Sequence, residues 1–91
     1  MTSEDLSQRR RRALWRASHR GTKELDLIIG GYAAARLEAM SAEELAVFEA
    51  FLVMEETHLQ DWLLAPEPVS GVPFAQIINA VRAFHGLKVA V

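Results

Sequence analysis

Apolar side chains that recur with the spacing of an α-helix are the feature that most restricts the fold of this chain. In residues 23–40 the recurring side chains are Leu25, Ile28, Ile29, Tyr32 and Ala33. In residues 73–85 they are Phe74, Ile77, Ile78, Val81 and Phe84. No stretch alternates apolar and polar residues as a half-buried strand does, and we find no internal repeat. The pattern predicts an all-α fold, a small bundle of about five short helices.

The N-terminal segment is strongly basic and has little apolar surface to bury. A first helix is predicted over residues 3–19, with Ser3 as its N-cap and Asp5 in its first turn, where a carboxylate suits the positive end of the helix dipole. The run from Arg9 to Arg12 covers a full helical turn, so at least one of these arginines must lie toward the body of the protein. We expect residues 1–11 to be held loosely.

A capping box marks the start of the third predicted helix. Ser41 and Glu44 have the spacing in which each side chain accepts from the other's backbone amide, so the helix is predicted to begin at Ala42. We expect Glu55 and Glu56 to end it on its exposed side.

Two shorter helices are predicted in the rest of the chain. Thr57 is expected to cap a fourth helix, which the proline-rich stretch 66–73 brings to an end. Pro73 suits the first position of a fifth helix, and Gly86 suits the C′ position that closes it. The tail, residues 87–91, either packs back or frays.

Composition narrows the classes of function. With 91 residues and 51% hydrophobic content, the chain is expected to form one domain over residues 1–91. It has no cysteine, which excludes disulfides, thiolate nucleophiles and sulfur-ligated metals. No apolar run reaches the roughly 18 residues of a membrane span, and the N-terminus resembles neither a signal peptide nor a mitochondrial presequence. We therefore expect a protein of the bacterial cytoplasm, with the mitochondrial matrix as the alternative.

The residues that could carry catalysis are scattered. His19, His58 and His85 lie near the ends of three different helices without an i, i+4 partner, so we predict neither a catalytic nor a metal site, and we expect each histidine at or near a helix terminus. The Arg9 to Arg12 run has three interpretations: a contact with nucleic-acid phosphates, a solvated basic face, or a surface that steers an acidic protein partner. The sequence lacks interleaved aromatic residues and a recognition-helix pattern, which favours the solvated face over nucleic acid, and a small nucleic-acid-binding protein remains the alternative function.

The segment 19–26 concentrates charge around a single glycine. Gly21 is expected to adopt the left-handed conformation that ends the first helix, and Glu24 to accept from an amide near the start of the second. This account gives Arg20 no part in the architecture, which suggests that it serves a protein partner. The neighbouring charged or titratable residues are Arg16, His19, Lys23 and Asp26.

The same segment resembles the signature of the small SdhE-type FAD assembly factors, also called succinate dehydrogenase assembly factors. That signature is an RGxxE motif, here Arg20-Gly21-Thr22-Lys23-Glu24, preceded by an aromatic residue and followed by Leu-Asp. The resemblance covers roughly residues 12–65. It continues through Leu45, Phe48, Leu52, Leu59, Trp62 and Leu63.

The resemblance implies an assembly chaperone rather than an enzyme. Such a protein binds the flavoprotein subunit of succinate dehydrogenase, and often that of fumarate reductase, and promotes covalent attachment of FAD to a histidine of that subunit. It implies no permanently bound cofactor, no nucleic-acid partner and no membrane insertion. The predicted partner-binding residues are the motif residues and their charged neighbours: Arg20, Gly21, Glu24, Arg16, Lys23 and Asp26. The Arg9 to Arg12 run and the stretch after residue 65 depart from the family pattern.

Overall fold

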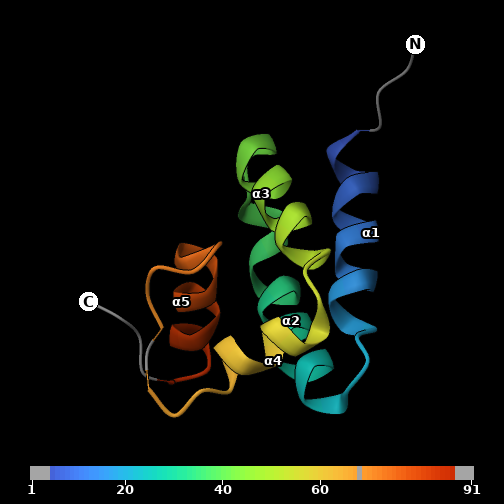
Figure 1. Ribbon diagram of the computed structural model, residues 1–91. Helices are drawn as coiled ribbons and strands as arrows, with labels where there is room; N and C mark the ends of the chain where they lie inside the picture. The colour runs from blue at the N-terminus through green and yellow to red at the C-terminus, as the bar shows by residue number, and fades with distance from the viewer. Residues whose placement is uncertain (1–4, 68, 88–91) are drawn as a thin grey trace.

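The computed structural model describes residues 5–67 and 69–87, and its regular structure there is entirely helical (Figure 1). The elements are α1 (Leu6–Ser18), α2 (Lys23–Arg36), the 3-10 helix η1 (Leu37–Ala39), α3 (Ala42–Leu52), α4 (Glu56–Leu63) and α5 (Ala75–Phe84). The predicted all-α fold is confirmed. None of these helices has both the length and the apolar character needed to cross a membrane. Of the predicted tail, residues 87–91, only Leu87 lies within the described residues, so its predicted behaviour stays a prediction.

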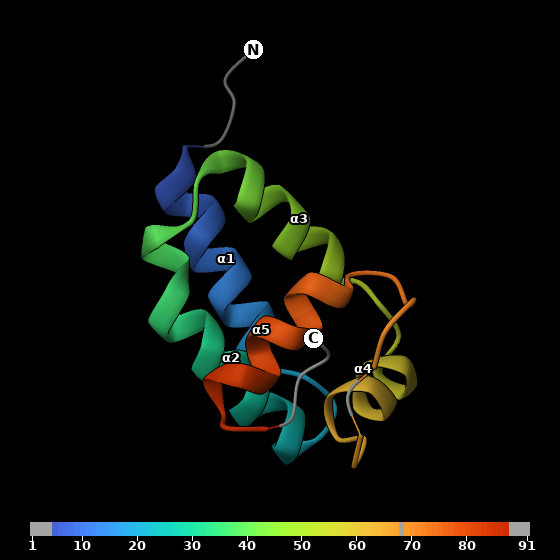
Figure 2. The same cartoon turned by 90° about the vertical axis from the view of Figure 1, so that its left-hand side faces the viewer.

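The helices pack as two groups that share α2. Helix α1 lies against α2 and α3, whereas α5 lies against α2 and α4 (Figures 1 and 2). The largest fully buried apolar side chains are Leu25, Ile29, Leu45, Phe48, Phe51, Leu59, Leu63, Ile78 and Val81. Helix α1 buries only Ala13 and Ala17. Small side chains let it approach α2 closely, and a Cβ added at Gly30 would lie 2.9 Å from the Ser18 hydroxyl oxygen.

Two of the predicted helix boundaries are confirmed by the hydrogen bonds at their caps. The Ser41 hydroxyl accepts from the Glu44 amide at 3.1 Å, and the Ser41 amide donates to the Glu44 carboxylate at 2.8 Å, which completes the capping box. Gly86 is left-handed, with a φ of 74°. The Leu87 amide donates to the Arg82 carbonyl at 2.8 Å, the bond expected when a left-handed C′ glycine closes a helix.

The predicted start of the first helix is wrong by several residues. Helix α1 begins at Leu6, and Asp5 is its N-cap rather than a first-turn residue. The Asp5 carboxylate accepts from the Gln8 amide at 2.8 Å and so satisfies one of the free donors of the first turn. Ser3 lies outside the described residues.

The predicted boundary between the third and fourth helices is also wrong. Helix α3 ends at Leu52, Glu55 is the N-cap of α4, and Thr57 lies inside α4. The reason is tertiary, because the Leu52 carbonyl and the Glu56 carboxylate both bond to the segment between α1 and α2. In a continuous helix the Leu52 carbonyl would accept from the Glu56 amide and would not be free to accept from Arg20.

Pro73 does not begin the fifth helix, which starts at Ala75. Phe74, the N-cap, has a φ of 60° in the left-handed region, which costs about 1–2 kcal/mol for a residue with a side chain. Its ring packs edge-on against Phe51 at 5.9 Å between centroids, and this burial offsets the strained backbone.

Two arginines of the basic run point toward the body of the protein, which confirms that not all four are solvated. Arg9 forms an ion pair with Glu49 at 2.8 Å. Arg10 donates to the Leu37 carbonyl at 2.9 Å and to the Met40 carbonyl at 2.8 Å. How loosely the N-terminal segment is held stays a prediction.

Candidate functional site

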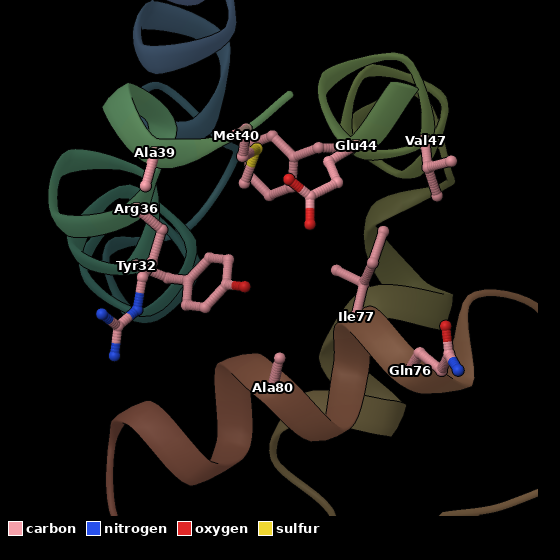
Figure 3. Close-up of a pocket in the computed structure, with 10 residues that line it drawn as sticks. Tyr32, Arg36, Ala39, Met40, Glu44, Val47, Gln76, Ile77 and Ala80 are labelled. Atoms are coloured by element: carbon pink, nitrogen blue, oxygen red, sulfur yellow. The ribbon is translucent and has the colours of Figure 1, made fainter. Parts of the chain in front are cut away.

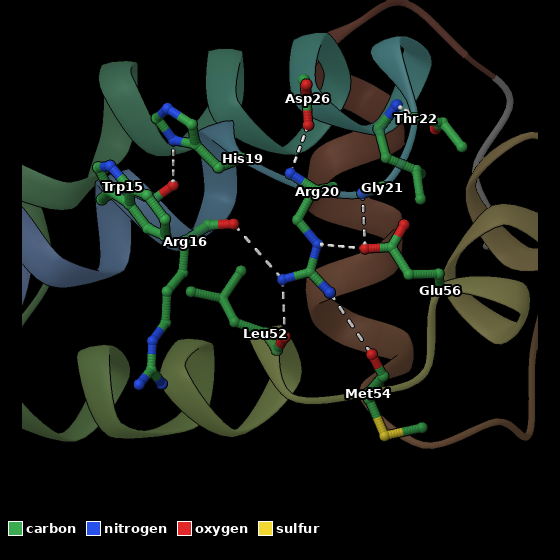
Figure 4. Close-up of polar contacts among 11 residues, drawn as sticks. Trp15, Arg16, His19, Arg20, Gly21, Thr22, Asp26, Leu52, Met54 and Glu56 are labelled. Atoms are coloured by element: carbon green, nitrogen blue, oxygen red, sulfur yellow. Dashed lines mark hydrogen bonds and ion pairs between the residues drawn. The ribbon is translucent and has the colours of Figure 1, made fainter.

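The RGxxE motif forms the corner between α1 and α2 (Figure 4). We call residues 19–26 the corner. His19 is the C-cap of α1, and Thr22 is the N-cap of α2, where its hydroxyl accepts from the Leu25 amide at 3.2 Å. Glu24 therefore occupies the second position of α2 and plays no part in the cap. The prediction that its carboxylate accepts from an amide at the helix start is wrong, because Thr22 takes that role.

Arg20 points into the protein, and its side chain is only 9% exposed. Its Nη1 donates to the Leu52 carbonyl at 2.8 Å, and its Nε forms an ion pair with the Glu56 carboxylate at 3.2 Å (Figure 4). The carbonyls at the end of a helix have no partner within the helix and carry partial negative charge, so a guanidinium is a suitable cap. The idea that the architecture has no use for Arg20 is wrong.

Gly21 is required for close approach rather than for a left-handed turn. It is absent from the positive-φ glycines, which are Gly71 and Gly86 among the described residues, so the predicted conformation is wrong. Its amide donates to Glu56 Oε1 at 2.9 Å. A Cβ at this position would lie 3.1 Å from Glu56 Oε2, so any larger residue would press against the carboxylate that closes the corner.

Asp26 fixes the corner from the other side. Its half-buried carboxylate accepts a hydrogen bond from the Arg20 amide, and its own amide donates to the Thr22 carbonyl at 3.0 Å. Backbone and side chain of Arg20 are therefore both held, the first by Asp26 and the second by Glu56 and the end of α3.

The remaining predicted site residues face outward. Arg16, Lys23 and Glu24 are exposed, and within the described part of the chain their side chains form no hydrogen bond or ion pair. Trp15, which is 62% exposed, stacks on the His19 ring at 4.3 Å beside them. The predicted set thus divides in two: Arg20, Gly21 and Asp26 build the corner, and Arg16, Lys23 and Glu24 are available on its surface.

Glu56 was missed by sequence reasoning, although it contacts both Arg20 and Gly21. The Leu59, Trp62 and Leu63 pattern does predict a helix near residue 57. Moving its cap from Thr57 to Glu55, two residues earlier, would have placed Glu56 in the first turn, but nothing local would have directed its carboxylate toward the corner.

The histidines make structural contacts. His19 Nδ1–H donates to the Trp15 carbonyl at 2.8 Å, and His85 Nε2–H donates to the Ile28 carbonyl at 2.7 Å. His19 and His85 are C-cap residues, and His58 lies in the first turn of α4, so their predicted places at helix ends are confirmed. Over residues 5–67 and 69–87, no three histidine, aspartate or glutamate side chains gather as metal ligands.

A groove of about 370 Å³ lies between α2, α3 and α5, at the opposite end of α2 from the corner (Figure 3). The Tyr32 ring extends into it, together with Ile77 and Ala80 of α5. Burial raises the pKa of the Tyr32 hydroxyl, Arg36 opposes the rise, and Glu44 adds to it. This groove shares no lining residue with the corner, so we assign it no part in the candidate site.

Comparison with known proteins identifies the family. Residues 11–85 match the Sdh5 family, which is described as "Flavinator of succinate dehydrogenase". The chain belongs to this flavinator family. The matched region contains the whole corner and all of α2 to α5, so it extends well beyond the resemblance to residues 12–65.

Several curated proteins are similar to this chain. An "FAD assembly factor SdhE" of Acetobacter pasteurianus is 44% identical over 69 residues, which cover 76% of this chain and 63% of that protein. A protein of the same name from Acinetobacter baylyi is 29% identical over 85 residues, which cover 92% of this chain and 99% of that protein. A "Succinate dehydrogenase assembly factor 2, mitochondrial" of Candida glabrata is 31% identical over 78% of this chain and 46% of its own length. This chain therefore spans less than two thirds of two of these relatives. No solved structure matches the chain.

Proposed function

We propose that this protein is an assembly factor that binds the flavoprotein subunit of succinate dehydrogenase and promotes covalent attachment of FAD to it. The observation that carries the proposal is the family match, which includes the complete RGxxE corner. Relatives that are similar over most of the chain are named FAD assembly factors. The flavoprotein of fumarate reductase is a second proposed client, and the bacterial cytoplasm is the proposed location.

The geometry supports a division of work within the motif. Arg20 and Asp26 hold the corner, because their polar groups are engaged within the chain. Gly21, Lys23, Glu24 and Arg16 meet the flavoprotein, with Glu24 making charge-assisted hydrogen bonds to it. A corner held in one conformation loses little entropy when it docks, and it can hold the client histidine and flavin in a reactive arrangement.

In this proposal the protein is not itself an enzyme and keeps no cofactor. The flavoprotein supplies both the histidine and the flavin, whose own electronic properties carry the chemistry. The chain contributes a docking surface that stabilises the competent form of its client.

The first prediction compares two glutamates that occupy the second position of their helices. Glu24 in α2 and Glu43 in α3 are both exposed, and neither has a side-chain partner in the described residues. Glu24→Ala is expected to lower covalent flavin in the client about tenfold or more, through loss of charge-assisted bonds. Glu43→Ala is expected to leave it unchanged.

The measurement is in-gel flavin fluorescence of the denatured flavoprotein from cells that carry each variant in place of the wild type. Circular dichroism checks that both variants stay helical. Equal flavinylation with Glu24→Ala and Glu43→Ala would contradict the proposed contact. Normal flavinylation in cells without the protein would contradict the function.

The nucleic-acid alternative receives no comparable support. Arg9 and Arg10 are engaged by Glu49 and by the carbonyls at the end of α2 and η1. The run therefore does not present all four of its cations to a phosphate backbone, which weakens the basic patch that nucleic-acid binding uses.

A further inference from the structure

One large apolar side chain of α1 lies in solvent rather than in the core. Trp15 is 62% exposed, and it is the largest exposed apolar side chain among the described residues. Helix α1 does not need it for packing, since the residues that the helix buries are Ala13 and Ala17. A tryptophan is usually well buried, because its ring carries a large apolar area. The position of Trp15 therefore suggests a role outside the fold.

The Trp15 ring is held in place on the surface. It stacks on the His19 ring, with 4.3 Å between the centroids and 13° between the planes. His19 is fixed in turn, because its Nδ1–H donates to the Trp15 carbonyl at 2.8 Å (Figure 4). The imidazole covers one face of the indole and leaves the other face open. A ring that is already held in one position loses little conformational entropy when a partner covers it.

The apolar surface continues on α2, where Leu27 is 71% exposed. A Cβ at Gly30 would lie 3.1 Å from Ser18 Cα, so α1 and α2 touch at these two residues. Trp15 precedes Ser18 by three residues, and Leu27 precedes Gly30 by three, so each lies about one helical turn from this contact. The two exposed apolar side chains therefore flank the same contact between the helices.

The apolar surface lies beside cations that are not engaged within the fold. Arg16 and Lys23 are exposed, and their side chains have no hydrogen-bond or ion-pair partner in residues 5–67 and 69–87. Between residues 15 and 27 the only exposed carboxylate is that of Glu24. Positive charge is therefore in excess around Trp15. Charge complementarity favours a partner in which carboxylates surround an apolar pocket.

Tryptophan and basic residues also occur together in proteins that bind anionic lipid surfaces. A helix that lies on a membrane buries a continuous apolar face along its length. Helix α1 offers no such face at Trp15, because the residues one turn before and after it are Arg11 and His19, which are both exposed. A single indole held among polar groups suits a pocket in a folded partner better than a lipid surface.

We propose that Trp15 is the anchor of the contact with the flavoprotein subunit, and that its indole enters an apolar pocket surrounded by carboxylates. This inference rests on the proposed function, and it extends the contact from the charged corner to α1. Arg16, the next residue, pairs with a carboxylate at the rim of that pocket. A few side chains supply most of the binding energy of an interface, and tryptophan and arginine are enriched among them.

The test compares two exposed apolar side chains that lie within helices. Trp15→Ala removes the anchor from α1. Val47→Ala is the control on α3, since Val47 is 49% exposed and lines the Tyr32 groove, which shares no residue with the corner. Binding of each full-length variant to the purified flavoprotein subunit is measured by titration calorimetry. Trp15→Ala is expected to bind about tenfold or more weakly than Val47→Ala.

A second measurement separates an anchor from a residue that only supports the corner. The chain has two tryptophans, so labelling with fluorotryptophan gives two fluorine NMR signals, and the signal missing from Trp15→Phe belongs to Trp15. The difference in its position between H₂O and D₂O reports exposure to solvent. This difference should disappear when the unlabelled flavoprotein subunit is added to the labelled wild type. Because this measurement needs no destabilising variant, it tests the inference even if Trp15→Ala unfolds in circular dichroism.

Equal affinity of Trp15→Ala and Val47→Ala, or a Trp15 signal that stays exposed to solvent in the complex, would overturn the inference and leave the proposed function standing. Failure of the wild type to bind the flavoprotein would overturn both. Vesicles of phosphatidylglycerol and phosphatidylcholine provide the other arm. If the wild type binds them, and Trp15→Ala loses only that binding, Trp15 serves a lipid surface and the inference is wrong.

Discussion

At the scale of single residues, Glu56 completes the corner from a distant part of the chain. One carboxylate oxygen accepts from the Gly21 amide and lies 3.2 Å from Arg20 Nε, so it serves both residues of the RG pair. The other oxygen is buried and has no hydrogen-bond partner in the described residues. This second oxygen is also the atom that a Cβ at position 21 would approach.

The second prediction is a double-mutant cycle on Gly21 and Glu56. Glu56→Ala is expected to lower the free energy of unfolding by about 1–2 kcal/mol. This loss is smaller than that of a fully buried ion pair, because the carboxylate is partly exposed and solvent screens it. Gly21→Ala is expected to cost about 1 kcal/mol, because its Cβ presses on that carboxylate. The double variant should lose less stability than the sum of the two single losses, since the clash disappears once the carboxylate is removed.

Urea unfolding of the wild type, the two single variants and the double variant measures this coupling. Strict additivity would show that Gly21 and Glu56 do not interact. Glu56→Gln, which keeps an acceptor for the Gly21 amide, should recover part of the loss.

At the scale of helices, three arginines cap the ends of helices to which they do not belong. Arg10 donates to the carbonyls that end α2 and η1, Arg20 to the end of α3, and Arg82 to the Trp62 and Leu63 carbonyls that end α4. Neither α3, α4 nor η1 has a basic residue in its own last turn. Helices η1, α3 and α4 therefore each receive from a neighbour the cation that their own last turn lacks.

The third prediction concerns Arg82, which is 1% exposed. Arg82→Met keeps most of the volume but leaves the carbonyls of Trp62 and Leu63 without their donor, so unfolding free energy should fall by about 2–3 kcal/mol. Arg11→Met, at an exposed position, should change it by no more than about 0.5 kcal/mol. Thermal and urea unfolding measure both, and similar stabilities would contradict the capping role.

These long-range caps explain what the sequence could and could not predict. The Ser41–Glu44 box and the Gly86 turn join residues a few positions apart, so local pattern was sufficient for them. The bonds of Arg20 to Leu52 and of Arg82 to Leu63 span 32 and 19 positions. Such pairings depend on how helices pack, which periodicity does not specify.

For the candidate site, too, the sequence predicted local features but not long-range contacts. Position and charge were enough to mark residues 19–26 as a corner and to propose Lys23 and Glu24 as surface groups, and both are exposed. Whether Arg20 faces outward or inward depends on the end of α3 lying beside it. A cluster of charge does not reveal which members are already engaged within the fold.

At the scale of the whole molecule, the two ends of α2 differ in character. The first end carries the corner, with its exposed Lys23 and Glu24. The second borders the groove into which Tyr32 extends. A change of pH or sequence in that groove should therefore alter stability without altering the proposed docking surface.

The fourth prediction follows from the raised pKa of Tyr32, caused mainly by burial. The unfolded chain loses this proton near pH 10, whereas the folded chain holds it to higher pH. The contribution of Tyr32 to stability is thus complete below pH 10 and is lost as pH rises through the folded pKa. Urea unfolding from about pH 9 to 11 should show a steeper loss for the wild type than for Tyr32→Phe. Parallel curves would show that the hydroxyl keeps its ordinary pKa.

The contacts of Arg20 have one further consequence, for local unfolding. This side chain joins the end of α1, the end of α3 and the start of α4, and the Gly21 amide bonds to the same carboxylate. The loop between α3 and α4 therefore cannot open without releasing the corner, so the two segments should exchange their amide hydrogens as one cooperative unit. A client that binds the corner would then slow hydrogen exchange in a loop that it does not touch.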